Sequence, residues 1–342
     1  MAYLYLTIFI GIIGLLDVYI KKIKPFFYVT SFLVILFCSL HYGVGFDFFS
    51  YELIYGSIGE FEYSDIKGEY GFLFLFDCLK TLGFSYEYAR ILILLCINIL
   101  FVGFINRYSS NKILSQFLLF TFYFTFLFSA LRQGLALSIF FCFGLNFLLK
   151  EKYIYFYILV LLISTIHVSA VILLLIPLYL KFNDFFKNKE LLIISVVFVL
   201  SIFSGIIVNK YISDYSETKF NIMGSAFRIA IFFVIYLLGK DNFKGNDYKF
   251  FQIYVLGFYI YLLFISFDLI ATRLFVYFKI LDIILLVRLL SYYKHKLPLT
   301  TFILIMGLLS FINILSGIAS DVKLEFYNYP YFSIFDAENF KF

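Results

Sequence analysis

Long apolar runs alternate with short polar connections along this chain. A helix that crosses a bilayer needs about 20 predominantly apolar residues, so the runs predict about 12 transmembrane helices. No internal repeat or Pro-rich linker divides the pattern, which predicts an all-α polytopic integral membrane protein with one transmembrane domain over residues 1–342. The expected spans are 3–20, 26–42, 86–105, 113–129, 131–149, 153–167, 168–181, 191–208, 225–239, 250–266, 269–290 and 299–318.

Basic residues give the expected orientation, because short cytoplasmic loops carry an excess of Lys and Arg. With the N-terminus outside, 16 of the 27 basic residues fall in inner loops. Merging 153–181 into one span would reverse the orientation of everything after it, so the charges favour two short helices there. The inner residues are Lys21, Lys22, Lys24, Arg107, Lys112, Lys150, Lys152, Lys181, Lys187, Lys189, Lys240, Lys244, Lys249, Arg288, Lys294 and Lys296.

The segment near 71–84 has a different pattern from the spans. Leu73 and Phe76 fall on one helical face, and Asp77 and Lys80 on the other, which predicts an amphipathic helix in the outer membrane interface. The alternative is a thirteenth span. In the preferred topology, residues 43–84 form an extracytoplasmic loop with this interfacial helix, and residues 319–342 form an extracytoplasmic tail.

Composition excludes several classes of protein. Apolar residues make up 63% of the chain, charged residues 14%, and the mean hydropathy is +0.97, values that a water-soluble domain does not have. The four cysteines lack C-x-x-C spacing and the three histidines lack a second ligand at helical spacing, so no metal and no cofactor is expected. The basic residues are dispersed over many loops rather than grouped in one stripe, which argues against nucleic acid as a partner.

A few polar residues fall where spans should begin or end, and the predicted orientation places them all on the outer side. A basic residue at the centre of a lipid-exposed helix costs about 2.5–3.5 kcal/mol, so we expect these side chains to line a wet cavity open to the outside. Each arginine could instead snorkel to lipid phosphates, and Lys279 and Asp282 could neutralise each other. The outer residues are Asp47, Arg132, His167, Arg228, Asp268 and Arg273.

Several arginines on one face favour an anion site. Guanidinium is permanently charged and offers forked donors that match phosphate oxygens, so a pyrophosphate group at the membrane surface is the expected ligand. A carboxylate or imidazole nearby could take a proton from an attacking hydroxyl. Asp47 and His167 are the candidates for that role.

Four short motifs follow one another in a recognisable order. They are G-x-D-x-x-x-Y over residues 45–51, R-Q-x-x-A from Arg132, H-x-S-A from His167 and R-x-x-x-Y-F from Arg273. Together they resemble the EpsG family of Wzy-like polysaccharide polymerases over nearly the whole chain. The sequence departs from the family pattern at His41, where an arginine is expected, and at Phe46, where a threonine is expected.

The resemblance implies a metal-independent membrane glycosyltransferase of the bacterial cytoplasmic membrane, with its active site facing the periplasm or the cell exterior. It would join oligosaccharide repeat units carried on undecaprenyl pyrophosphate into O-antigen, capsule or exopolysaccharide. The implied partners are these lipid-linked sugars, the lipid bilayer, a flippase and a chain-length regulator.

The resemblance and the polar pattern together give the expected site. The expected catalytic residues are Asp47, His167, Arg132 and Arg273, and the expected substrate contacts are Arg228, His41, Tyr51, Gln133, Asp268 and Tyr277. Two other functions fit a basic hydrated cavity. One is a flippase or transporter of the lipid-linked oligosaccharide, and the other is an O-antigen ligase.

Overall fold

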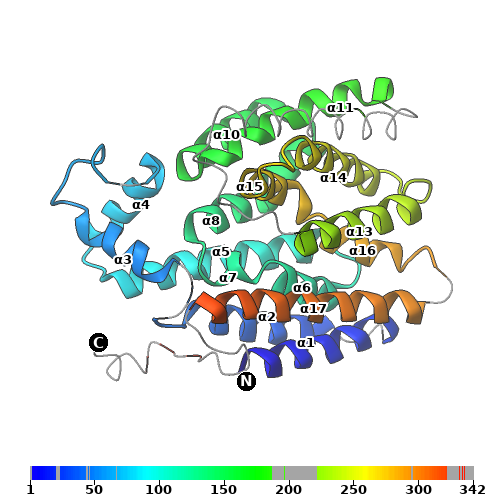
Figure 1. The fold of residues 1–342 in the computed structure, drawn as a ribbon, viewed down its shortest axis with the longest axis horizontal. Coiled ribbons are helices and arrows are strands. Elements are labelled where there is room, and N and C mark those ends of the chain that lie inside the picture. The colour runs from blue at the N-terminus through cyan, green and yellow to red at the C-terminus, as the bar shows by residue number, and fades with distance from the viewer. Residues whose placement is uncertain are drawn as a thin grey trace. The chain divides into compact units, whose positions relative to one another are not determined.

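Helices are the main secondary structure of the part that the computed structural model describes, and the described residues add only two isolated β-bridges and the connecting turns and loops. Figure 1 labels the helices. The chain divides into two compact units. Unit 1 comprises Met1–Asn146, Ile158–Val168 and Tyr293–Phe342, and unit 2 comprises Phe147–Tyr157 and Ser169–Tyr292. The structure describes residues 2–20, 24–43, 45, 47–66, 68–186, 196, 222–293, 296–321, 331, 333 and 335.

Helix α6 lies at the centre of unit 1. All residues from Ile113 to Phe122 are buried, including the polar Ser115, Gln116 and Thr121. Helices α1 and α17 pack on α6, and α2 packs on α5. A Cβ at Gly14 would lie 3.3 Å from the Cα of Leu114, so this glycine lets α1 approach α6 closely. These helices are α1 (Ala2–Tyr19), α2 (Lys24–Ser39), α5 (Tyr86–Tyr108), α6 (Lys112–Phe122) and α17 (Lys296–Asp321).

Shorter helices complete unit 1 and position its polar residues. Helix α3 (Phe48–Ser57) and helix α4 (Tyr70–Thr81) form a pair, and Lys80 joins them by donating hydrogen bonds to three carbonyl oxygens at the end of α3. Helix α7 (Phe124–Phe128) leads into α8 (Leu131–Ile139). A π-helical turn, η1 (Phe140–Gly144), then joins α8 to α9 (Leu145–Leu149).

Helix α14 forms the core of unit 2. Every residue from Phe250 to Leu262 is buried, and α14 packs against α11, α15 and α16. A Cβ at Gly257 would collide with the side chain of Phe278, so the glycine allows α14 and α15 to lie in close contact. The unit contains α11 (Leu175–Phe186), α13 (Ile222–Gly239), α14 (Asn246–Leu263), α15 (Asp268–Lys279) and α16 (Asp282–Leu289).

Among the described residues, four helices are long and apolar enough to cross a membrane: Ala2–Tyr19, Tyr86–Tyr108, Leu131–Leu149 and Lys296–Gly317. The prediction of an all-helical membrane protein is therefore confirmed, but the count of twelve spans is not. The shorter apolar helices are Pro25–Ser39, Lys112–Phe122, Tyr153–Ile166, Val168–Phe182 and Gly224–Gly239. The expected span 191–208 lies outside the described residues except for Val196.

Two expected spans are each divided in the structure. Residues 113–129 form α6 and α7, separated at Tyr123, whose φ of −127° leaves the helical region. Residues 269–290 form α15 and α16, with the break between Lys279 and Asp282. The expectation of one continuous helix in each range was wrong, because hydropathy measures the apolar character of a run and not its backbone continuity.

Two other boundary predictions agree with the structure. Helix α10 (Tyr153–Ile166) ends just before His167, and a 3₁₀ turn, η2 (Val168–Leu174), begins just after it and leads into α11. The segment near 71–84 contains α4, which buries Leu73 and Phe76. Its place in the outer interface stays a prediction, as does the single transmembrane domain.

Candidate functional site

Glu69, the residue directly before α4, joins two other segments of unit 1. Its Oε2 accepts a hydrogen bond from Arg132 Nη1 at 2.5 Å, and its Oε1 lies 3.0 Å from His167 Nδ1. Arg132 is the second residue of α8, and His167 is the hinge residue after α10. One carboxylate therefore brings together two residues that the sequence predicted to be catalytic.

Tyr51 of α3 completes this group. Its hydroxyl oxygen lies 3.4 Å from Arg132 Nε and 3.4 Å from the Arg132 backbone nitrogen, and both nitrogens donate to it. The guanidinium carbon lies 5.6 Å from the centre of the tyrosine ring, within the range of a cation–π contact. We call Tyr51, Glu69, Arg132 and His167 the Glu69 cluster.

The charge state of Glu69 follows from its neighbours. Burial by itself would raise the pKa of this carboxyl, but the hydrogen bond from His167 and the positive charge of Arg132 outweigh burial and lower the pKa to about 2. Glu69 is therefore ionised at neutral pH and can only accept hydrogen bonds.

This charge state determines the histidine tautomer. Because the carboxylate cannot donate, His167 Nδ1 carries the proton toward Glu69 Oε1, and in the neutral form of an imidazole held in this way the lone pair lies on Nε2. Nε2 is buried and has no hydrogen-bond partner among the described residues. A carboxylate thus orients an imidazole whose second nitrogen makes no hydrogen bond to the described part of the chain.

Two glycines allow the backbones of the cluster to approach. A Cβ at Gly71 would lie 2.9 Å from the carbonyl carbon of Thr165 and would clash with its side chain. Gly71 follows Glu69 by two residues and Thr165 precedes His167 by two, so this approach of α4 to α10 brings the carboxylate to the imidazole. Gly134 has a similar role in α8, because a Cβ there would clash with the carbonyl oxygen of Phe126.

A second polar contact in unit 1 joins Arg90 of α5 to His41. Both residues are buried, at 2% and 1% exposure. Arg90 Nη1 lies 2.9 Å from His41 Nε2 and Nη2 donates to the His41 carbonyl oxygen, while His41 Nδ1 lies 2.8 Å from the carbonyl oxygen of Cys38. Guanidinium has no acceptor, so Nε2 accepts and Nδ1 donates.

The Arg90 contact bears on the first motif. His41 uses both ring nitrogens within the protein, and its predicted contact with substrate stays a prediction. An arginine is expected from the resemblance at position 41, where this chain has His41. Arg90 brings a guanidinium into contact with that histidine. Arg90 is not among the residues predicted for the site, because it lies inside an apolar run. A charged residue within a predicted span was the signal that could have found it.

Unit 2 has its own arginine–carboxylate pair. Arg228 Nη1 of α13 lies 3.2 Å from Asp268 Oδ1, at the start of α15, and 3.3 Å from the Tyr261 hydroxyl oxygen. Its guanidinium carbon lies 5.6 Å from the Tyr261 ring centre. We call Arg228, Tyr261 and Asp268 the Asp268 cluster. The expectation that the arginines of both units line one cavity stays a prediction.

The remaining predicted residues lie at defined places. Asp47 directly precedes α3, and its carbonyl oxygen accepts a hydrogen bond from the Tyr51 backbone nitrogen at 3.0 Å. Gln133 follows Arg132 in α8 and is partly exposed. In α15, Arg273 lies between Asp268 and the fully buried Tyr277.

Glu69 is not among the residues that the sequence predicted for the site, and it is one of several carboxylates between residues 43 and 70. Nothing in a run of loop carboxylates distinguishes the one that packing will bury. Its position immediately before an amphipathic helix was the available signal.

Comparison with known proteins gives one match. The model of the EpsG family matches residues 24–333, which includes both clusters and Arg90. No curated protein and no solved structure matches the chain significantly. Because the family model covers nearly the whole chain and all four ordered motifs, this membrane protein belongs to the EpsG family.

Proposed function

We propose that the protein is a polymerase that joins undecaprenyl-pyrophosphate-linked oligosaccharide repeat units at the outer face of the cytoplasmic membrane. Its product would be a surface polysaccharide: O-antigen, capsule or exopolysaccharide. Membership of the EpsG family supports the reaction class, and the apolar helices suit a lipid-linked substrate. The observation that carries the proposal is the Glu69 cluster, in which one carboxylate holds an imidazole base and a guanidinium together.

The proposed reaction forms one bond and breaks one. The acceptor sugar hydroxyl attacks the anomeric carbon of the growing chain, and the bond from that carbon to the pyrophosphate oxygen breaks. His167 Nε2 takes the hydroxyl proton, and the lipid pyrophosphate leaves with the bonding electrons. Glu69 stabilises the imidazolium that forms, as a buried carboxylate does in acid–base triads.

Arg132 would neutralise the departing pyrophosphate. Its guanidinium uses Nη1 for Glu69 and Nε for Tyr51, and the side chain is 29% exposed. Electrostatic stabilisation of developing charge is commonly the largest catalytic contribution. Arg228 and Arg273 are proposed as further contacts to the diphosphate, and Asp47 as the alternative proton acceptor.

Reconstitution tests this proposal. The full chain in proteoliposomes, supplied with lipid-linked repeat units on the outer side, should give a ladder of polymer lengths. Glu69→Gln and His167→Ala should abolish the ladder, whereas Glu60→Gln, which removes an exposed carboxylate from the same loop, should leave it unchanged. An unaltered ladder in both cluster variants would overturn the proposed role of the cluster.

The same experiment separates the enzyme from a flippase. Substrate that is already on the outer side needs no transport, so polymer growth requires catalysis. If the wild-type protein moves lipid-linked units across the bilayer and forms no polymer, the chain is a transporter.

A further inference from the structure

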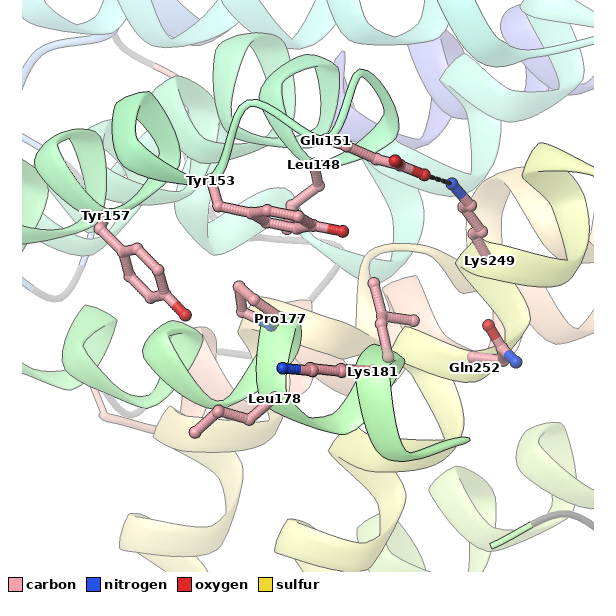
Figure 2. A pocket seen from close by; sticks show the side chains of 10 residues that line it. Leu148, Glu151, Tyr153, Tyr157, Pro177, Leu178, Lys181, Lys249 and Gln252 are labelled. Atoms are coloured by element: carbon pink, nitrogen blue, oxygen red, sulfur yellow. Dashed lines mark hydrogen bonds and ion pairs between the residues drawn. The ribbon is translucent and has the colours of Figure 1, made fainter. Parts of the chain in front are cut away.

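A pocket of about 540 Å³ lies within unit 2, between the start of α10, α11 and α14 (Figure 2). None of its lining residues belongs to the Glu69 cluster, and the proposed reaction does not use it. Leu148, Pro177 and Leu178 supply apolar wall, and Tyr153 and Tyr157 line the α10 side.

The pocket carries an excess of positive charge. Two lysines, Lys181 and Lys249, line it together with one carboxylate, Glu151. Lys181 has no ion-pair partner among the described residues. Lys249 Nζ lies 3.3 Å from Glu151 Oε1, but these side chains are 36% and 64% exposed, so their pair is weak. An anionic ligand could therefore pair with Lys181 without breaking an existing ion pair. It could also replace Glu151 as the partner of Lys249.

The pocket also offers apolar surface that a water-soluble anion would not use. Tyr153 and Leu178 are 41% and 52% exposed, and Pro177 lies beside Lys181 (Figure 2). Tyrosines are common where a membrane protein meets the headgroup region. The distribution of basic residues predicts the ends carrying Lys181 and Lys249 on the cytoplasmic side, where the surface is rich in anionic lipid.

We propose that this pocket binds an anionic phospholipid of the cytoplasmic leaflet. The headgroup phosphate accepts hydrogen bonds from Lys181 and Lys249, and an acyl chain lies along Pro177 and Leu178. Charge complementarity supports this occupant, because an uncharged headgroup would leave the lysine excess uncompensated. The site does not depend on the proposed polymerase reaction.

Native mass spectrometry of the full chain in mixed micelles tests the proposal. The wild-type protein should retain phosphatidylglycerol in preference to phosphatidylcholine. Lys181→Ala and Lys249→Ala should each lower the retained phosphatidylglycerol about fivefold, as expected when one lysine near an anionic headgroup contributes about 1 kcal/mol. Glu151→Gln should raise retention, because it frees Lys249 and removes the repelling carboxylate.

Two controls keep the result interpretable. Lys150→Ala removes an exposed lysine beside the pocket that does not line it, and it should retain lipid as the wild type does. Lys181→Arg keeps the charge and should keep the lipid. Equal retention by wild type and Lys181→Ala would overturn the proposal, and so would an equal loss in Lys150→Ala. Full competition by soluble glycerol phosphate would show a site for free phosphate esters instead.

Discussion

The Glu69 and Asp268 clusters share most of their chemistry and differ in one group. Each pairs an arginine with a carboxylate beside a tyrosine hydroxyl, and both guanidinium carbons lie 5.6 Å from the tyrosine ring centre. Glu69 uses its second oxygen to hold His167, whereas the described contacts of the Asp268 cluster include no histidine. In the proposed reaction, this difference assigns proton transfer to the Glu69 cluster and only the holding of substrate to the Asp268 cluster.

Replacing the base should have the largest effect and separate the two clusters most clearly. His167→Gln should lower the polymerisation rate about 10²–10⁴-fold, the usual contribution of a positioned general base. Asp268→Asn should lower it less than about tenfold, since we assign that cluster to holding substrate. Initial rates of polymer formation in proteoliposomes measure both. An equal loss of polymerisation rate in the two variants would contradict the assignment of proton transfer to the Glu69 cluster alone.

Arg132 should show the next largest effect. Arg132→Ala should lower the rate about 10²–10³-fold, as for the loss of one donor to a developing anion. Arg132→Lys should keep partial activity, because the charge remains while the fork is lost. Membrane insertion should be unchanged in both variants. Full activity of Arg132→Ala would show that this arginine takes no part in the reaction.

Gly71 tests whether close backbone approach assembles the Glu69 cluster. Gly71→Ala should destabilise unit 1 by about 1–3 kcal/mol, the usual cost of overpacking, because the new Cβ meets Thr165. The separation of Glu69 from His167 should increase and activity should fall. Thermal unfolding in detergent measures the first effect.

Gly56→Ala is the matched control for Gly71→Ala. Gly56 lies in α3 and a Cβ there meets nothing within 4 Å, so alanine should be neutral or slightly stabilising. Loss of stability equal to that of Gly71→Ala would argue against the packing explanation.

The smallest expected effect is the pH dependence of stability. The folded-state pKa of Glu69 is lowered from 4.5 to about 2, so its stabilising contribution is complete above the unfolded-state value. This stabilising contribution is lost as the pH falls from 4.5 to about 2. The melting temperature of wild type should fall more steeply over this interval than that of Glu69→Gln. Parallel curves would contradict the assignment of Glu69 as an ionised, hydrogen-bonded carboxylate.

The sequence by itself determined that the chain is a helical membrane protein and where most helices lie. It also placed the hinge at His167 and singled out Arg132 and Arg228, because apolar runs and misplaced charges are local signals. It did not find the breaks at Tyr123 and after Lys279, which depend on backbone geometry within runs that are apolar throughout.

Only the tertiary structure decided which side chains meet. Glu69 is separated from Arg132 by 63 positions and from His167 by 98, and no pattern along the chain relates residues so far apart. Their contact arises because Gly71 lets α4 reach the backbone of α10. Likewise, Arg90 reaches His41 across 49 positions. Hydropathy is a property of each segment, whereas a cluster depends on how closely two segments can pack.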